Sequence, residues 1–96
     1  MSHEDRVRLV AGIDVGASST KGVILGKNGI IHQYLTETLD PNFTVTHLMK
    51  ILISNIKIDS SIQAVSVCGG GSRMIGKEIL GIPVQRVDEI VANGLG

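Results

Sequence analysis

The 96-residue sequence has almost no aromatic side chains, since Tyr34 and Phe43 are the only two and tryptophan is absent. Recognition of bases by stacking on aromatic side chains is therefore not expected. The single cysteine, Cys68, excludes an internal disulfide and a thiol-only zinc site. Nine basic and nine acidic residues cancel, so no basic field indicates nucleic acid or an anionic membrane as a partner.

Long hydrophobic runs are also missing, because no apolar stretch approaches the roughly 20 residues that span a membrane. The first residues, MSHEDRVR, are polar and include acids, unlike a secretory signal. We therefore expect a cytoplasmic protein. The composition, 43% hydrophobic and 19% charged, is typical of a globular chain. We assign residues 1–8 to a polar N-terminal tail and residues 9–96 to one domain.

The first half of the chain predicts three strands and a helix. Apolar runs indicate strands at 9–15, 22–25 and 30–38, the first of them buried on both faces, with a hairpin turn at Asn28-Gly29. Asp40 followed by Pro41 is a helix-start signal. Apolar residues then recur at three- and four-residue spacings, so a helix is expected to continue to about Lys57.

The second half predicts strands that alternate with helices. A strand at 62–68 leads into a turn of three glycines, after which Ser72 can cap a short helix closed by Gly81. A strand at 82–87 and a helix from Asp88 complete the order β-β-β-α-β-α-β-α. This order predicts an α/β fold, a ribonuclease H-like mixed sheet in a single lobe.

Asp14 stands at the end of the first predicted strand, within the stretch GIDVGASSTKGVIL. Ligands of α/β sheets bind beyond the carboxyl ends of strands, where a carboxylate can hold Mg²⁺ directly or through water. A carboxylate that only caps a turn explains the same position equally well.

The turn after Asp14 is rich in small and hydroxylated residues. Successive backbone N–H groups in a tight turn can form an anion site, to which hydroxyls and a lysine would add donors and charge. The alternative is a plain hairpin between two strands, and the motif is not a P-loop because GxxxxGK[ST] is absent. The candidate phosphate ligands are Gly16, Ala17, Ser18, Ser19, Thr20 and Lys21.

Two further segments carry candidate site residues. Gly69, Gly70 and Gly71 stand between a strand and a predicted helix, where backbone N–H groups can face a phosphate. A sharp strand-to-helix turn is the simpler interpretation of these glycines. Asp88 and Glu89 open the last predicted helix, where acids favour the helix dipole. If that segment lines the same cleft as Asp14, Glu89 is a candidate general base.

Taken together, these motifs resemble a known superfamily. GIDVGASSTKGVIL resembles the first phosphate-binding motif of the actin, sugar kinase and Hsp70 ATPases, in which a β-hairpin cradles the phosphates of ATP. The resemblance implies ATP and Mg²⁺ as cofactors. It also implies that Asp14 is the magnesium-side acid and that Gly16 to Thr20 form the phosphate loop.

Two branches of the superfamily match different parts of the chain. The activator ATPases of 2-hydroxyacyl-CoA dehydratases and benzoyl-CoA reductases have a similar opening motif and a segment similar to EIVANGLG. Their iron–sulfur cluster is ligated by cysteines beyond the equivalent of this chain's end, and Cys68 does not match them. Type II pantothenate kinases have segments similar to CGGGSR and IPVQRVDE, which would make Glu89 the catalytic base. The activators usually have Gly-Tyr-Gly-Arg in place of GGGSR, and the kinases usually have Gly-Gly-Thr in place of Gly16-Ala17-Ser18.

The resemblance also implies a second lobe, because members of this superfamily bind ATP between two lobes. We therefore expect the N-terminal part of a longer protein, or a lobe that pairs with another copy as a homo-oligomer, and little activity from the 96 residues alone. The leading hypothesis is the ATP-binding lobe of an activator-type ATPase, with a CoA-linked substrate or partner enzyme. The alternatives are a lobe similar to pantothenate kinase and a free-standing, non-catalytic binding or assembly module.

Overall fold

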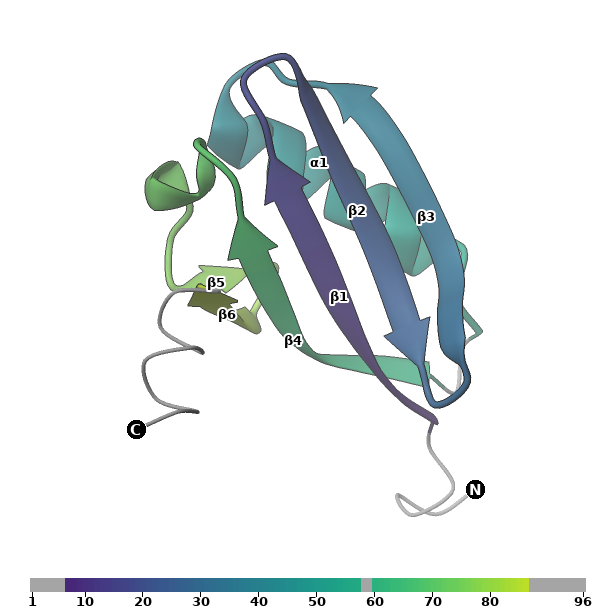
Figure 1. Ribbon diagram of the computed structural model, residues 1–96. Coiled ribbons are helices and arrows are strands. Elements are labelled where there is room, and N and C mark those ends of the chain that lie inside the picture. Colours follow the sequence, from purple (N-terminus) through teal and green to yellow (C-terminus); the bar gives the residue numbers. More distant parts are fainter. Residues whose placement is uncertain (1–6, 58–59, 87–96) are drawn as a thin grey trace.

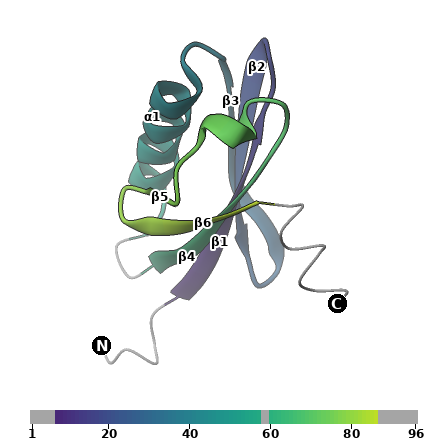
Figure 2. The ribbon, with the colours of Figure 1, turned by 90° about the vertical axis from the view of Figure 1, so that its left-hand side faces the viewer.

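The structure, a computed structural model, describes residues 7–57 and 60–86. Their six strands form a mixed sheet in the order β3-β2-β1-β4-β6-β5, and one face of this sheet is covered by helix α1 (Pro41–Ser54) (Figures 1 and 2). The predicted α/β class and mixed sheet are confirmed. The strands are β1 (Val7–Val15), β2 (Ser19–Gly26), β3 (Gly29–Glu37), β4 (Ser60–Cys68), β5 (Glu78–Ile79) and β6 (Ile82–Arg86).

The sheet combines an antiparallel meander with parallel strands. β1, β2 and β3 are joined antiparallel, and the predicted hairpin turn lies between β2 and β3, with Gly29 at a φ of 118°. β4 runs parallel to β1, and β6 runs parallel to β4. The carboxyl ends of β1 and β4 therefore lie at the same edge of the sheet, where ligands of α/β folds bind.

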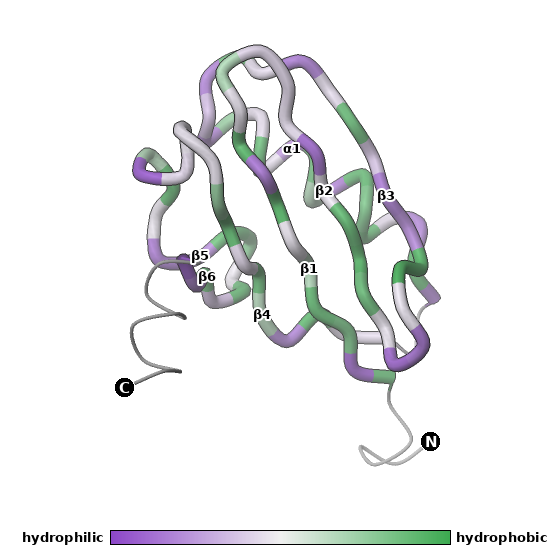
Figure 3. The backbone as a smooth tube through the Cα atoms, viewed as in Figure 1, coloured by the Kyte–Doolittle hydropathy of each residue, from purple (hydrophilic) through white to green (hydrophobic). Residues whose placement is uncertain are grey.

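The core lies between the sheet and α1. Apolar side chains of β1, β2 and β4 meet the buried face of the helix, and Figure 3 shows β1 and β4 as hydrophobic along most of their length. A side chain at Gly22 would overlap Leu48 and Leu52, so this glycine lets the helix approach β2 closely. The core residues of these elements are Leu9, Ala11, Ile13, Val15, Ile24, Val45, Leu48, Met49, Leu52, Val65 and Val67.

Burial along β1 alternates, whereas the sequence predicted a strand buried on both faces. Leu9, Ile13 and Val15 point toward α1, while Val10 is 43% exposed and Asp14 is also exposed. The alternation follows from the pleat, because successive side chains point to opposite faces and α1 covers one of them. Asp14 is thereby directed to the face opposite the helix.

The helix predicted after Ser72 is wrong. The chain makes a single 3₁₀ turn (Ser72–Met74) and then the short hairpin β5–β6, in which Ile79 pairs with Ile82. Leu80 and Gly81 form the two-residue turn with φ values of 52° and 81°, as the turns of tight hairpins require. Gly81 was predicted to close that helix, and it lies in the hairpin turn instead, because helix ends and hairpin turns both use a glycine at positive φ.

Several element boundaries differ from the predicted ones. β1 begins at Val7 and β2 at Ser19, so both strands are longer than expected, and α1 ends at Ser54 rather than near Lys57. Asp40 caps α1 as predicted, since its Oδ2 accepts a hydrogen bond of 3.0 Å from the Phe43 amide. The helix predicted from Asp88 lies outside the described residues. Within residues 7–57 and 60–86, no helix has the length and hydrophobicity that a membrane crossing requires.

Candidate functional site

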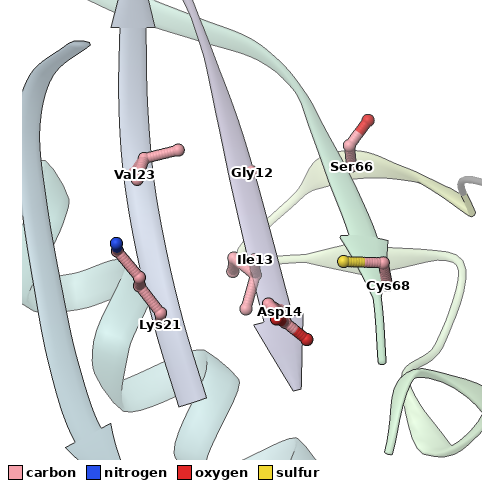
Figure 4. A pocket seen from close by; sticks show the side chains of 7 residues that line it. All are labelled: Gly12, Ile13, Asp14, Lys21, Val23, Ser66 and Cys68. Atoms are coloured by element: carbon pink, nitrogen blue, oxygen red, sulfur yellow. The ribbon is translucent and has the colours of Figure 1, made fainter. Parts of the chain in front are cut away.

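Asp14 lies one residue before the end of β1, on the face of the sheet opposite α1. Across the sheet it pairs with Lys21 of antiparallel β2 on one side and with Cys68 of parallel β4 on the other. The strand register therefore places a carboxylate between a lysine and a thiol, although the three residues are far apart in the sequence. Figure 4 shows the Cys68 sulfur pointing toward β1, where Asp14 lies.

An open groove of about 340 Å³ surrounds this row of residues on the exposed face. Gly12 and Val23 line it toward the middle of the sheet, and Ser66 lies on β4, two residues before Cys68 (Figure 4). Of the residues that line this groove, only Asp14 and Lys21 were candidate site residues in the sequence. The full lining is Gly12, Ile13, Asp14, Lys21, Val23, Ser66 and Cys68.

The glycine loop after β4 lies directly against the end of β1. The Gly71 amide donates a hydrogen bond of 2.9 Å to the carbonyl of Val15. Gly69 has a φ of 94°, and a Cβ atom there would lie 2.6 Å from Oδ1 of Asp14. Only a residue without a side chain permits this approach, so the structure brings together Asp14 and Gly69, which the sequence placed in separate motifs.

The hairpin loop after β1 is shorter than predicted. Gly16 donates a hydrogen bond of 3.0 Å to the carbonyl of Ser19, which closes the turn, and β2 begins at Ser19. Within the part of the chain that the structure describes, the amides of Ala17 and Ser18 donate to no acceptor. The amide of Gly70, in the neighbouring loop, also donates to no acceptor within the described residues. Free backbone N–H groups at two adjacent loops are suited to an anion.

Thr20 belongs to the helix side of the sheet and not to the groove. Its side chain is completely buried, and its hydroxyl forms a 2.7 Å hydrogen bond with the hydroxyl of Thr38. The amide of Thr38 also donates to the carbonyl of Ser18, at 2.9 Å. Thr20 and Thr38 therefore fix the base of the hairpin loop from the helix side of the sheet. Lys21, the next residue, points to the opposite face and lines the groove.

The pKa of the Cys68 thiol lies above its ordinary value. Partial burial raises the pKa of the thiol, and the negative charge of Asp14 and a side-chain hydrogen bond to it raise this pKa further. The thiol is thus held in its neutral form beside the carboxylate. The sequence offered no signal for this pair, because the register of two parallel strands cannot be read from one chain.

A metal ion at this site would depend on Asp14 alone among the described residues. Within residues 7–57 and 60–86, no group of three or more histidine, cysteine, aspartate or glutamate side chains could hold a metal. One exposed carboxylate fits Mg²⁺, which keeps several waters and takes its remaining ligands from substrate phosphates. Glu89, the candidate base, lies outside the described residues.

Comparison with known proteins shows similarity at the level of the fold. No family model matches the chain, and no curated protein matches it. A ligand-bound xylulose kinase from Lactobacillus acidophilus is similar at 22% identity and a TM-score of 0.59, over 66% of this chain and 16% of the kinase. Gluconate kinase from the same organism is similar at 22% identity and a TM-score of 0.57, over 66% and 15%.

A third solved structure covers more of the chain. The activator of 2-hydroxyisocaproyl-CoA dehydratase from Clostridium difficile, with bound ADPNP, is similar at 18% identity and a TM-score of 0.61. The match covers 81% of this chain and 29% of the activator, so the chain spans less than a third of each of the three proteins. These likenesses show that the chain has a ribonuclease H-like fold.

Proposed function

We propose that this chain is a nucleotide-binding lobe that holds the phosphates of Mg²⁺-ATP at the edge where β1 and β4 end. The observation that carries the proposal is the convergence of Asp14 with two loops, 16–18 and 69–71, at this edge. Each of the three was a candidate in the sequence, and each alone had a simpler explanation. The approach of Gly69 to Asp14 and the hydrogen bond from Gly71 to Val15 bring them to one edge of the sheet, which favours a shared ligand.

In this proposal the backbone amides of the two loops bind the phosphate oxygens. The amides of Ala17, Ser18 and Gly70 have no acceptor within the described chain, so they are available without breaking a hydrogen bond of the fold. Ser19 and Lys21 would add a hydroxyl and a positive charge from β2. The Thr20 hydroxyl is not included, because Thr38 already binds it.

Mg²⁺, when bound, would neutralise phosphate charge and orient the terminal phosphate. Asp14 would hold this ion through its exposed carboxylate, directly or through water. No iron–sulfur cluster is proposed for this chain, because Cys68 is its single cysteine and clusters need several thiolates.

For the parent activity, we favour an ATPase of the CoA-dehydratase-activator type. The supports are the opening motif through Leu25, the segment EIVANGLG, and the presence of an activator among the proteins of similar fold. ATP hydrolysis would then drive closure against a second lobe or another copy, and the motion would be passed to a partner enzyme with a CoA-linked substrate. A lobe similar to pantothenate kinase, with Glu89 as base, is the second candidate, favoured by CGGGSR and IPVQRVDE.

A non-catalytic binding or assembly module is the third candidate. It is favoured by the open groove, which would leave much of a nucleotide in contact with solvent. Pantothenate-dependent release of ADP, abolished by Glu89→Gln, would identify the kinase. ADP release without pantothenate would favour the ATPase, and nucleotide binding without turnover would favour the module.

Calorimetric titration with Mg²⁺-ATP tests nucleotide binding itself. We expect measurable affinity for the 96-residue chain, a strong loss in Asp14→Asn, and a loss at least as large when EDTA removes Mg²⁺, because the unpaired Asp14 carboxylate then repels the phosphates. Alkylation of Cys68 supplies a second probe, because a nucleotide in the groove would shield this thiol. No heat and no shielding at millimolar Mg²⁺-ATP would contradict the proposal for this chain.

A further inference from the structure

The glycine loop beside Asp14 is tied to the fold at its far end by two side chains from different elements. Asn42, in the first turn of α1, donates a hydrogen bond of 2.6 Å from Nδ2 to the carbonyl of Met74. Arg86, the last residue of β6, donates from a guanidinium nitrogen to the carbonyl of Ile75, and more weakly, at 3.5 Å, to that of Ser72. Both residues reach the 3₁₀ turn that follows the loop.

Backbone hydrogen bonds hold the N-terminal end of the loop, next to β1. The Gly71 amide binds the carbonyl of Val15, and the amides of Ser72 and Met74 close successive turns on Gly69 and Gly71. No regular helix or long strand holds residues 69–75 in place. The position of the free Gly70 amide beside Asp14 therefore depends on the burial of Ile75 in the core and on a few individual hydrogen bonds.

We propose that Asn42 and Arg86 are positioning residues that clamp the segment Gly69–Ile75 in the conformation that accepts phosphate. The inference rests on the proposed function and adds to it two residues that line no part of the groove. Removing one donor lets the loop populate other arrangements. The apparent affinity for nucleotide then falls in proportion to the fraction of chains that keep the competent one.

Asn42→Asp is the decisive variant. It keeps the size of the side chain but replaces the donor with an acceptor that repels the Met74 carbonyl. An acid in the first turn of a helix interacts favourably with the helix dipole, so α1 itself should be as stable as before or more stable. Asn28→Asp, in the β2–β3 turn at the other end of β2, makes the same change of charge away from the loop and serves as the control.

Two measurements are made on each chain: hydrogen exchange of the Gly71, Ser72, Met74 and Ile75 amides, and the dissociation constant for Mg²⁺-ATP. We expect Asn42→Asp to speed exchange of these amides by about fivefold, the factor that loss of one ordinary hydrogen bond gives, and to weaken binding by up to the same factor. The melting temperature should not fall. Arg86→Met should reproduce both effects, and Arg86→Lys should recover part of them.

The outcomes separate the clamp from the proposed function. If the wild-type chain binds Mg²⁺-ATP and Asn42→Asp binds it equally well, the clamp is wrong and the nucleotide site stands. If exchange of the four amides in Asn42→Asp matches that in Asn28→Asp, the clamp is also wrong. If the wild-type chain binds no nucleotide, the proposed function fails and the positioning role is overturned with it.

Discussion

The carboxylate of Asp14 and the thiol of Cys68 lie side by side, because the two residues are partners in the parallel register of β1 and β4. Both side chains point to the face that α1 leaves open, and both line the same groove. Partial burial raises the pKa of Cys68, and the nearby charge of Asp14 raises it further. Their proximity also makes the single cysteine of the chain a reporter placed at the proposed phosphate site.

The first prediction concerns the reactivity of this thiol. The thiolate is the nucleophile, so a raised pKa makes alkylation of Cys68 slower at a given pH than in the unfolded chain. Asp14→Asn removes the negative charge, which should lower this pKa and shift the pH–rate profile to lower pH. Alkylation by iodoacetamide followed by mass spectrometry measures the profile. A profile that does not move would show that Asp14 does not act on the thiol.

The second prediction concerns two adjacent glycines. Gly69→Ala places a Cβ atom against Asp14 and the Val15 carbonyl at a φ of 94°, so we expect a loss of roughly 2 kcal/mol in the free energy of unfolding. Gly70→Ala is the matched control, since a Cβ atom there meets nothing within 4 Å. It should change stability by less than about 0.5 kcal/mol. Urea denaturation of both variants checks the difference, and equal losses would refute the close approach.

The third prediction concerns the hydroxyl pair beneath the hairpin loop. Thr20→Val and Thr38→Val should each destabilise the fold, because each leaves the other hydroxyl without its partner. In a double-mutant cycle the two losses should be less than additive, with a coupling energy of about 1 kcal/mol. Urea denaturation of the four chains supplies this value. Strict additivity would mean that the two hydroxyls do not interact.

The fourth prediction concerns the start of α1. Asp40→Ala removes the acceptor of the Phe43 amide and should lower the free energy of unfolding by about 1 kcal/mol. Asp40→Ser should retain most of the stability, because a serine oxygen caps a helix nearly as well. Thermal denaturation compares the two variants. A serine variant as unstable as the alanine variant would indicate a role for Asp40 other than capping.

The sequence by itself determined the elements whose signals are local. The apolar runs of β1, β2 and β4, the Asn28-Gly29 turn and the cap of α1 at Asp40 were all predictable, because each depends on neighbours within a few residues. The same local evidence failed after Ser72. Ile75 and Ile79 have helical spacing, but both enter the core from a 3₁₀ turn and a short hairpin instead.

Only the tertiary structure decided which candidates share a site. The pleat and the single covering helix directed Asp14 and Lys21 to one face of the sheet and the Thr20 hydroxyl to the other. The register of β1 with β4 placed Cys68 beside Asp14 and allowed Gly69 to approach it. Pairing between strands some 50 residues apart is set by the packing of the whole core, so no local pattern in the chain specifies it.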